Sequence, residues 1–599
     1  MPRPHGQLRQ SAVLRGSGPG AMVDMPNHAV IIGGLEFWKG EMKQLFEPRL
    51  TAKITQLLKI PDVKLFTPPP ASNDPAAPAT GIDVFRFPEW FTAQYEDRPA
   101  EGVRSRPLIH QKALVGGRYQ RDRKKYGIVP VRFVQACRNG HISDVDWRVF
   151  VHGPDDQCHR PLWLDERGTS GDLADVTVRC ECGKERSLAQ ATRPFTLGAC
   201  LGQRPWLGPS VVAGEKCSGI DGKVEYNHLL IRSATNAYFA ETMSVISLPD
   251  AGAALRAAVD QVWEDFLQYV ESTDDLVREK KKAKVAAALT GQNDTDVLAE
   301  IQRRKSGVPP VLKPIKQDEL DVLMKSAESL GEDVPEGEFY ARALPLPAKR
   351  SAILEKIERV VLVHRLREVI AQVGFTRFQA AIPDIDGELD IDVRRAPLAR
   401  ETSWLPAVEN RGEGVFVAFR QNAIGEWLQR PEVQQRAQAL KLGFDRWKQQ
   451  QNSDLDFPDM RYIMLHSLSH LLITAVSLEA GYSASSIRER VYVGPAGCGI
   501  LLHTGSSDAE GTLGGLVQIG RRLEHHLNQA LALGQLCSND PVCAQHSPDS
   551  VHEERFLLGA ACHGCLLIAE TSCERRNEFL DRALVVSTVD AHGAEFFRI

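Results

Sequence analysis

Short apolar runs in the first half of the chain have the composition of β-strands. Between residues 128 and 250, the runs VPVRFV, DVTVRC, NHLLIRS and SVISLP are rich in β-branched residues and are separated by Cys, Gly and Pro. This pattern predicts a β-rich module. Upstream, VFRFPEWF predicts another short strand, whereas the Pro-rich stretch 67–80 offers little to bury and predicts a loop.

Helical spacing of apolar residues begins after residue 250. In residues 251–345, the runs ALRAAVDQVWEDFLQYV, DDLVREKKKAKVAAAL and TDVLAEIQRRK combine helical periodicity with strongly charged faces. They predict a charged helical insertion. The basic runs 280–284 and 303–305 are interpreted as solvated helix faces rather than as binding sites.

The C-terminal part of the chain mixes both patterns. ILEKIERVVLVHRLREVIAQVGF, from residue 353, predicts a long helix, and MLHSLSHLLITAVSLEAGY predicts a buried helix that ends at Gly481. VENRGEGVFVAFR predicts two strands joined by a glycine turn, and GILLHT predicts a buried strand. SASSIRERVYV predicts a helix, and ALVVSTVDAHG predicts a last strand.

These elements together predict a mixed α/β, multidomain protein. We expect an N-terminal region at 1–127, a Cys-rich, zinc-bearing β module at 128–250 and the charged helical insertion at 251–345. An α/β domain at 346–599 follows, in which segment 498–590 is expected to bind zinc. With 599 residues, the chain is long enough for several domains of ordinary size.

Composition and charge exclude several classes of protein. Hydrophobic residues make up 43% and charged residues 25%, as in an ordinary globular protein. The net charge of −5 means that any nucleic-acid contact has to come from a local patch. The basic N-terminus lacks the apolar core of a secretory signal. Because the most apolar stretch, 462–482, is interrupted by His, Ser and Glu, we expect a buried helix there and a cytoplasmic protein without membrane contact.

The twelve cysteines are concentrated in two clusters. Six lie between residues 137 and 217, five lie between residues 537 and 573, and only Cys498 stands apart. In a reducing compartment we expect thiols or metal ligands rather than disulfides. Cysteines that merely fill a core would be scattered, so the clustering favours metal sites.

The C-terminal cluster has the spacing of a zinc knuckle. Cys562 and Cys565 are separated by two residues, so two thiolates on one tight turn can share a tetrahedral ion. Cys573 lies eight residues further on, and Cys537 or Cys543 can close the site. Since one zinc ion takes four ligands and five cysteines are present, one cysteine is expected to be spare. The alternative is a chance cluster of small core residues.

The N-terminal cluster is looser and predicts at least one further zinc ion. Its candidate ligands are Cys137, His141, Cys158, Cys180, Cys182, Cys200 and Cys217. Seven ligands suffice for one ion, or for two ions with shared or missing ligands, and the pairing stays open. The alternative for the histidine is a polar surface residue. Because sites with four protein ligands leave no position for water, we expect Zn²⁺ to stabilise the fold rather than to catalyse a reaction.

Motifs of common ATPases and hydrolases are absent from the sequence. It contains no G-x-x-x-x-G-K-[ST] phosphate loop, no H-E-x-x-H motif and no G-x-S-x-G elbow. His466 and His470 share one helix face, but Ser467 stands where a metalloprotease has its base, which favours a buried structural pair. The loop from His503 to Glu510 carries His, Ser, Asp and Glu among glycines. A metal-dependent nuclease or hydrolase that uses these two regions is therefore the alternative to a non-catalytic role.

A strongly basic stretch precedes the β module. GRYQRDRKKYG places Arg118, Arg121, Arg123, Lys124 and Lys125 beside two tyrosines. This is the composition of a surface that binds phosphates and stacks on bases, so it is our candidate nucleic-acid contact. A solvated loop is the alternative.

Several of these motifs together resemble a known module. MLHSLSHLLI, GYSASSIRERVY, EGTLGGL, CSNDPVC and ACHGCLLIAETSCERRNEFLDR resemble the MrfA-associated zinc-binding domain, found at the ends of certain superfamily 2 DNA helicases and in separate helicase-companion proteins. SGPGAMVD, CRNGHISDVDW, the C-x-C-G pair and CLGQRPWLG extend the likeness to the first half. Outside about 255–345, the chain resembles the DrmB family, the helicase-less partners in the DISARM anti-phage system.

The resemblance implies a ligand set and partners. It makes Cys562, Cys565 and Cys573 zinc ligands, with Asn577 and Asp581 as accompanying residues. The helicases of this group carry a further cysteine just before the C-x-x-C pair, which is absent here, so a cysteine of CSNDPVC has to supply the fourth ligand. The implied function is that of a non-catalytic partner of a DrmA-like superfamily 2 helicase. Such a subunit would engage DNA, single-stranded or with overhangs, and would stimulate or position the motor in bacterial anti-phage defence.

Overall fold

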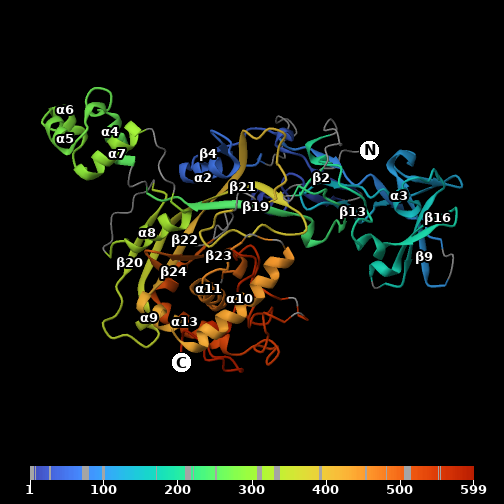
Figure 1. Cartoon of the computed structure of the whole chain (residues 1–599). Coiled ribbons are helices and arrows are strands. Elements are labelled where there is room, and N and C mark those ends of the chain that lie inside the picture. The colour runs from blue at the N-terminus through green and yellow to red at the C-terminus, as the bar shows by residue number, and fades with distance from the viewer. Residues whose placement is uncertain are drawn as a thin grey trace. The chain divides into compact units, whose positions relative to one another are not determined.

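The computed structural model describes the chain from residue 6 to residue 598 apart from short gaps. The residues outside the description are 1–5, 7, 26–27, 71–79, 98–100, 170, 209–216, 220–221, 250–252, 307–312, 329–336, 390–393, 452, 454, 481, 505–514, 551, 554 and 599. Most of the Pro-rich stretch and Gly481 are therefore not described. The chain divides into two compact units, and Figure 1 labels their main helices and strands. Unit 1 comprises Met1–Val245, Val369–Asp384 and Glu388–Glu409, and unit 2 comprises Ile246–Glu368, Ile385–Gly387 and Asn410–Ile599.

Unit 1 is built from small sheets, as its short β-rich runs predict. The largest has the strand order β12 (Ile128–Pro130), β8 (Trp90–Ala93), β9 (Val103–His110), β15 (Leu162–Arg167), β16 (Val176–Cys180) and β17 (Glu185–Ser187). Two three-stranded sheets have the orders β1 (Met22–Met25), β2 (His28–Ile32), β7 (Val84–Arg86) and β14 (Ile142–Ser143), β13 (Phe133–Ala136), β18 (His228–Ile231). The remaining short pairs are β3 (Trp38–Lys39) with β6 (Gly81–Ile82) and β10 (Tyr119–Arg121) with β11 (Lys124–Tyr126). Strand β4 (Gln44–Leu45) pairs with β5 (Lys64–Phe66), which joins the large sheet through β22 (Trp404–Phe419).

Unit 1 also contains α1 (Gln10–Arg15), α2 (Pro48–Leu58) and α3 (Trp147–His152). Helix α3 packs against β16 and β17. It begins where the Asp146 carboxylate accepts hydrogen bonds from two backbone amides of the first turn, which satisfies groups that have no partner within the helix. Its Trp147 and Phe150 are buried in the same core as Leu162 and Val178 of the largest sheet. The helix therefore seals one side of the Cys-rich β module.

A buried arginine joins two of the glycine motifs in unit 1. Arg377, 1% exposed, donates hydrogen bonds to the carbonyl oxygens of Gly20 at 2.7 Å, Gly140 at 3.0 Å and Ala237 at 2.6 Å. Gly20 has a φ of +82°, and a Cβ there would lie 2.4 Å from the Phe375 ring, so only glycine fits. Burial lowers the pKa of Arg377 to about 10. SGPGAMVD and CRNGH thus converge on one side chain.

A large sheet and the helices that cover it form unit 2. The strand order is β19 (Phe239–Ile246), β21 (Ile357–Thr376), β22 (Trp404–Phe419), β24 (Gly497–Thr504) and β23 (Ile487–Gly494), with β20 (Tyr340–Leu344) paired to β21. The first three of these strands contribute residues to both units. The helices around it are α8 (Ile315–Met324), α9 (Gln421–Leu428), α10 (Pro431–Gln451), α11 (Met460–Ala480), α12 (Gly515–Arg521) and α13 (Leu523–Gln535).

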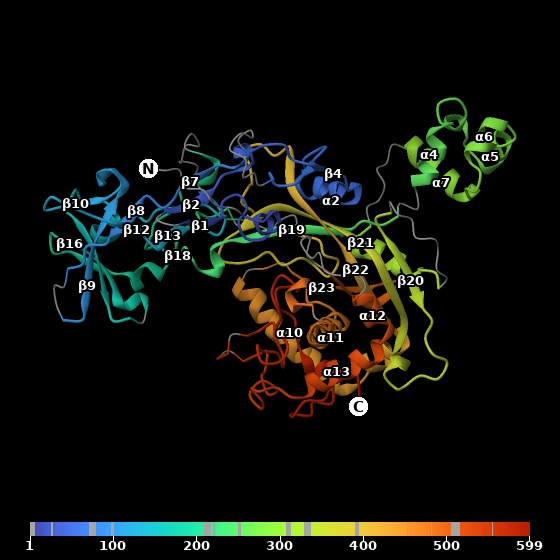
Figure 2. The same cartoon turned by 180° about the vertical axis from the view of Figure 1, so that it is seen from behind.

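Helix α11 is the central helix of unit 2. It packs against β23, β24 and α13, and α10, α11 and α13 lie on one side of β23 (Figure 2). Its stretch Met460–Glu479 is long and apolar enough to cross a membrane by composition alone, but 78% of the most apolar window is buried inside the protein. The predicted buried helix is confirmed. The observed mixture of helices and sheets also confirms the predicted α/β class.

The charged stretch after residue 250 forms α4 (Ala253–Asp260), α5 (Thr273–Glu279), α6 (Ala283–Ala288) and α7 (Asp294–Ser306). These helices share a small apolar core. Five of their cations face acidic partners, as on solvated helix faces: Lys280 with Asp294, Lys282 with Glu279, Lys284 with Asp265, and Arg303 and Arg304 with Glu300.

Several predicted elements in the second half are wrong. The expected long helix from residue 353 is instead strand β21, and nearly all of its side chains are buried. A run of apolar, β-branched residues that is covered on both faces satisfies helical spacing as well, so periodicity could not separate the two structures. SASSIRERVYV forms a 3-10 turn and β23 rather than a helix, and ALVVSTVDAHG forms no strand.

The expected glycine turn in VENRGEGVFVAFR is also absent, because β22 runs through it without a break. Gly412 lies against the neighbouring strand, and a Cβ there would come within 1.8 Å of Thr504 Oγ1. The glycine therefore permits a close approach between strands rather than a reversal of the chain.

Candidate metal centres

Groups of four cysteine, histidine or glutamate side chains gather at four places among the described residues, and Glu479, His525 and His526 form a smaller, largely exposed group. In each four-membered cluster, the potential ligand atoms lie within 4.8 Å of one another. The clusters are Cys137, His141, Cys200 and Cys217; His152, Cys158, Cys180 and Cys182; Cys537, Cys543, Cys562 and Cys565; and His466, His470, Glu489 and Cys573. The first two belong to unit 1 and the last two to unit 2.

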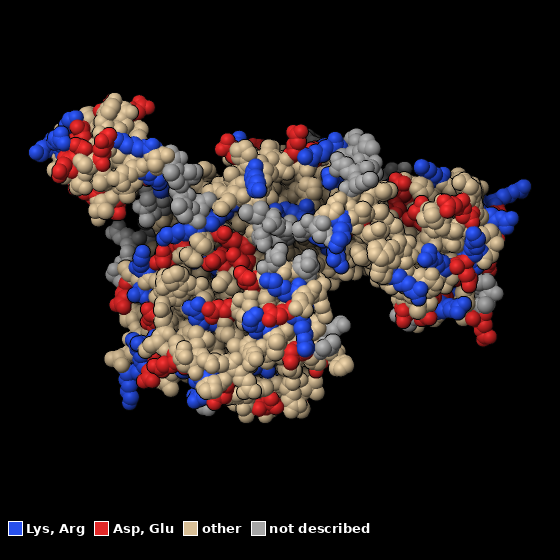
Figure 3. Space-filling view, viewed as in Figure 1, with Lys and Arg blue, Asp and Glu red and all other residues tan. Residues whose placement is uncertain are grey.

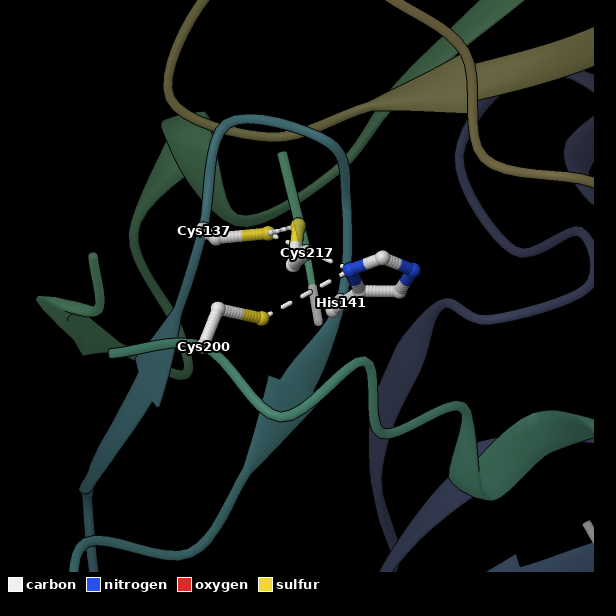
Figure 4. A group of neighbouring side chains, drawn as sticks. All are labelled: Cys137, His141, Cys200 and Cys217. Carbon is white, nitrogen blue, oxygen red and sulfur yellow. Dashed lines mark hydrogen bonds between the residues drawn. The ribbon is translucent and has the colours of Figure 1, made fainter. Parts of the chain in front are cut away.

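The first cluster closes the loop between β13 and β14 of unit 1. Figure 4 shows Cys137 and His141 on the two sides of this loop, with Cys200 and Cys217 completing the group. His141 Nδ1 lies 3.4 Å from Cys137 Sγ and 3.6 Å from Cys200 Sγ, and the Sγ atoms of Cys137 and Cys217 are 3.8 Å apart. The hydrogen bond from Cys137, opposed by burial, lowers the pKa of Cys200 to about 4. The thiolate is the form that binds metal.

The second cluster contains a ligand that the sequence did not single out. Cys158 Sγ lies 3.7 Å from Cys180 Sγ, and Cys182 Sγ lies 4.0 Å from His152 Nδ1. The Cys180–Gly183 turn is closed by a backbone hydrogen bond of 3.0 Å, as in a zinc knuckle. His152 ends α3, six residues before Cys158, and nothing in that spacing marks it as a ligand. The seven predicted ligands thus separate into two groups of four, with His152 as the eighth.

The third cluster contains both cysteines of CSNDPVC together with the C-x-x-C pair. Sulfur–sulfur distances are 3.3 Å for Cys537 and Cys562, and 3.8 Å for Cys543 and Cys565 and for Cys562 and Cys565. The edge of a tetrahedron with Zn–S bonds of about 2.3 Å is about 3.8 Å, so the donor set fits Zn²⁺. Backbone N–H groups of Asn539 and Gly564 donate to two of these sulfurs, which favours thiolates.

Cys573 lies apart from this four-cysteine cluster. Its sulfur lies 3.1 Å from His466 Nε2, against α11. The expected set, with Cys573 beside Cys562 and Cys565 and only one cysteine of CSNDPVC, therefore differs from the geometry. Two residues were expected to accompany the ligands. Asn577 donates its backbone N–H to Cys573 Sγ at 3.2 Å, whereas the Asp581 carboxylate accepts a hydrogen bond from Arg436 Nε at 2.6 Å.

The two regions of the catalytic alternative do not meet in the described part of the chain. His466 and His470 are fully buried and face each other and Glu489. His503 is buried in β24, where burial lowers its pKa to about 4. The rest of the His503–Glu510 loop lies outside the described residues.

The basic stretch of unit 1 forms the β10–β11 hairpin. Tyr119 pairs with Tyr126 and Arg121 with Lys124 across it. The Arg121 guanidinium packs over the rings of Tyr95 at 4.9 Å and Trp163 at 5.3 Å. The aromatic base thus holds the hairpin, and four of its five cations are exposed: Arg118, Arg123, Lys124 and Lys125.

Comparison with known proteins agrees with these features. Residues 9–239 match a domain of unknown function, DUF8724, and residues 468–566 match the MrfA Zn-binding domain, which contains the four-cysteine cluster. The DISARM protein DrmB of Bacillus paralicheniformis is 32% identical over 500 residues, which cover 80% of this chain and 83% of that protein.

A crystal structure of the DUF1998 helicase MrfA bound to DNA has 13% sequence identity, over 36% of this chain and 23% of the helicase chain. The TM-score of 0.18 is too low for a statement on the fold. The identity to DrmB and its coverage of both chains confirm the relationship that the sequence motifs predict: the chain belongs to the DrmB family of DISARM proteins.

Proposed function

We propose that the chain is a non-catalytic subunit that helps a DrmA-like superfamily 2 helicase to engage DNA in bacterial anti-phage defence, in the cytoplasm. The observation that carries the proposal is the four-cysteine cluster within the segment that matches the MrfA Zn-binding domain. Four protein ligands leave no open position for a substrate or water, so zinc there would hold the fold. The sequence also has no phosphate loop, so the motor is assigned to a partner chain.

The DNA contact is assigned to the β10–β11 hairpin. Its Arg118, Arg123, Lys124 and Lys125 are exposed, and none of them has an ion-pair partner among the described residues. On the face that Figure 3 shows, Lys and Arg are largely intermixed with Asp and Glu, and Lys280, Lys282 and Lys284 of the helical insertion are paired. Unpaired cations on a firmly held hairpin keep their charge available for phosphates.

A second basic surface of unit 1 is a weaker candidate. A cleft of about 350 Å³ is lined by Arg104, Arg106, Arg132 and Arg167. Glu166 lies within 3.4 Å of Arg106 and 2.8 Å of Arg132, so part of this charge is neutralised within the cleft. The hairpin therefore offers the stronger field to a polyanion.

The test measures the ATPase rate of the purified helicase with and without this chain, on single-stranded, overhang and blunt DNA. We expect no ATPase from the chain alone and a rise in the DNA-stimulated rate of the mixture. No rise on any DNA would contradict the proposal. DNA cleavage by the chain in the presence of divalent metal, lost in His466→Ala, would support the catalytic alternative instead.

Charge reversal tests the assigned DNA contact. Replacement of Arg118, Arg123, Lys124 and Lys125 by glutamate should weaken DNA binding by the complex. The slope of log K for DNA against log salt concentration should become shallower by about 0.7–0.9 for each phosphate contact removed. Arg121 is kept, because it packs on the aromatic base. Reversal of Lys280, Lys282 and Lys284 is the matched control and should leave the salt slope unchanged. Equal slopes for both variants would move the DNA contact elsewhere.

A further inference from the structure

Four potential metal ligands meet in the core of unit 2. Two of them, His466 and Cys573, lie outside the segment that matches the MrfA Zn-binding domain. His466 and His470 lie one turn apart on α11, Glu489 lies on β23, and Cys573 lies in the C-terminal segment. His466 Nε2 is 2.9 Å from Glu489 Oε1 and 3.1 Å from Cys573 Sγ, and His470 Nε2 is 3.2 Å from the same carboxylate oxygen. One turn of helix and two further segments thus converge on one point.

The outer hydrogen bonds fix the state of the two histidines. His466 Nδ1 lies 3.2 Å from the Phe579 carbonyl, and His470 Nδ1 lies 2.8 Å from the Leu566 carbonyl. A carbonyl oxygen only accepts, so each Nδ1 carries the proton and donates it. In a neutral ring, each Nε2 then presents a lone pair to the shared point. Metal-binding histidines are held in this way, with the other ring nitrogen donating to a carbonyl or carboxylate.

Backbone N–H donors point at the other two groups, but burial and the charge of Glu489 raise the pKa of the Cys573 thiol well above its ordinary value. Cys573 Sγ accepts hydrogen bonds from the backbone N–H of Arg575 at 3.3 Å and Asn577 at 3.2 Å. Glu489 accepts from the backbone N–H of Glu574 at 3.3 Å and from the Ser469 hydroxyl. A thiolate and a carboxylate in a buried site carry two negative charges, and burying such charges without compensation is costly.

No placement of protons on the two histidine rings alone satisfies all four groups. A proton on His466 Nε2 would satisfy Glu489 and Cys573, but it would leave the lone pair of His470 Nε2 facing a carboxylate oxygen. Protons on both rings would place two imidazolium ions 4.6 Å apart, centroid to centroid, inside the core. One divalent cation neutralises both anions and accepts all four lone pairs.

We propose that His466, His470, Glu489 and Cys573 bind a divalent transition-metal ion, zinc in the first instance, in a closed structural site separate from the cysteine-rich clusters. A mixed nitrogen, oxygen and sulfur set suits a borderline ion such as Zn²⁺ rather than Mg²⁺ or Ca²⁺. The separations of 2.9–3.2 Å are a few tenths of an ångström shorter than the edges, about 3.3–3.8 Å, of a tetrahedron with bonds of about 2.0–2.3 Å. The side chains of both histidines and of Glu489 are 0% exposed, so no solvent-facing position is left for catalysis.

The site would fasten a part of the chain that has little regular structure of its own. Between Leu536 and Arg598, the described residues contain one 3-10 turn, Arg582–Leu584, and one isolated bridge, Leu558 with Leu580. The four-cysteine cluster joins positions 537–565 to one another, whereas Cys573 is the cluster ligand through which an ion would add to the hydrogen bonds between this segment and α11. The ion would therefore connect the C-terminal segment to the main core of unit 2.

The test is the zinc content of the purified full-length chain, measured by inductively coupled plasma mass spectrometry. We expect four equivalents in the wild type, and one fewer in Cys573→Ser and in His470→Gln. Cys498→Ser is the matched control, because Cys498 is equally buried and belongs to no cluster. Far-UV circular dichroism shows whether each variant is folded. Folded variants that keep the full wild-type content would overturn the proposal.

A measurement on the wild type decides the question where the variants do not fold. After exchange with ¹¹³Cd²⁺, the three cysteine-rich clusters should give resonances shifted far downfield by three or four sulfur ligands. The proposed site has a single sulfur, so it should add a separate resonance well upfield of the others. Its presence supports the site, and a spectrum that contains only sulfur-rich resonances overturns it.

Discussion

The buried ion pair between Asp581 and Arg436 gives a sharp test of how the C-terminal segment is held. The Asp581 carboxylate accepts hydrogen bonds from Arg436 Nε at 2.6 Å, from Ala560 N at 3.0 Å and from Ala583 N at 3.1 Å. The side chains of the pair are 0% and 8% exposed. The ion pair joins α10 to the residues just before Arg582, and the bond from Ala560 joins these residues to the chain that leads into the knuckle at Cys562.

Asp581→Asn keeps the shape of the side chain and removes its charge. Arg436 then stays buried without its counter-ion, and breaking such a pair from one side costs about 3–5 kcal/mol. Lys441 and Asp445 on the same helix form an exposed pair, with side chains 57% and 43% exposed. Asp445→Asn is therefore the control and should cost only about 0.3–0.5 kcal/mol.

Urea unfolding of the full-length chain measures both changes, with the transition of unit 2 followed by protection of its peptides from proteolysis. Burial acts to raise the pKa of Asp581, but Arg436 outweighs it and the pKa is lowered. The ionised form is thus the stabilising one. Its contribution is complete above the unfolded pKa of about 3.9 and is lost as the pH falls through the lower folded pKa. A cost for Asp581→Asn within about 1 kcal/mol of the control would refute the assigned role of the pair.

Four further outcomes are expected. Cys537→Ser and Cys543→Ser should each remove one zinc equivalent relative to the wild type, because both sulfurs belong to one cluster; a loss with only one of them would contradict the geometry. His152→Asn should remove one equivalent from unit 1, and an unchanged content would show that the second cluster is held by its cysteines alone. Burial holds the pKa of His503 at about 4, so the unfolded chain takes up the proton first, and the free energy of unfolding should fall by up to about 3 kcal/mol as the pH drops from about 6.5 to 4; His503→Gln should flatten this limb in urea titrations, and an identical pH profile would speak against it. Chelation at neutral pH should raise the rate of trypsin cleavage within 537–598, and mass spectrometry of the fragments would reveal the sites; unchanged cleavage would mean that metal does not order this segment.

The sequence allowed some elements to be predicted and concealed others for a physical reason. Helix α11 was predictable because its apolar run is long and continues from one end of the helix to the other. Strand β21 was not, because a strand buried on both faces has no alternation to recognise. In β23, Arg488, Glu489 and Arg490 resemble a solvated helix turn, yet each has a partner from another element: Glu368 for Arg488, His466 for Glu489 and Glu319 for Arg490.

The candidate metal ligands also include some that the sequence revealed and some that it concealed. Cys562 and Cys565 lie on one turn, so spacing alone paired them. His466 and Cys573 are 107 residues apart, and no local pattern shows that such residues meet. His152 was not predicted as a ligand, because a single histidine in the last turn of a helix is common. Local spacing thus identified the ligand types and the knuckles, whereas the grouping of ligands depended on tertiary contacts.

The distribution of the clusters over the two units has a consequence for stability. Each cluster in unit 1 joins loops of the Cys-rich β module, and each cluster in unit 2 joins the irregular C-terminal segment either to itself or to α11 and β23. Binding energy becomes folding energy only for the segments whose ligands an ion connects. Removal of the ion proposed at Cys573 should therefore expose the segment after Cys565 while α11, buried against β23, β24 and α13, stays protected from hydrogen exchange. Exchange of α11 amides at the same rate as those of the C-terminal segment would show instead that the ion supports the whole core of unit 2.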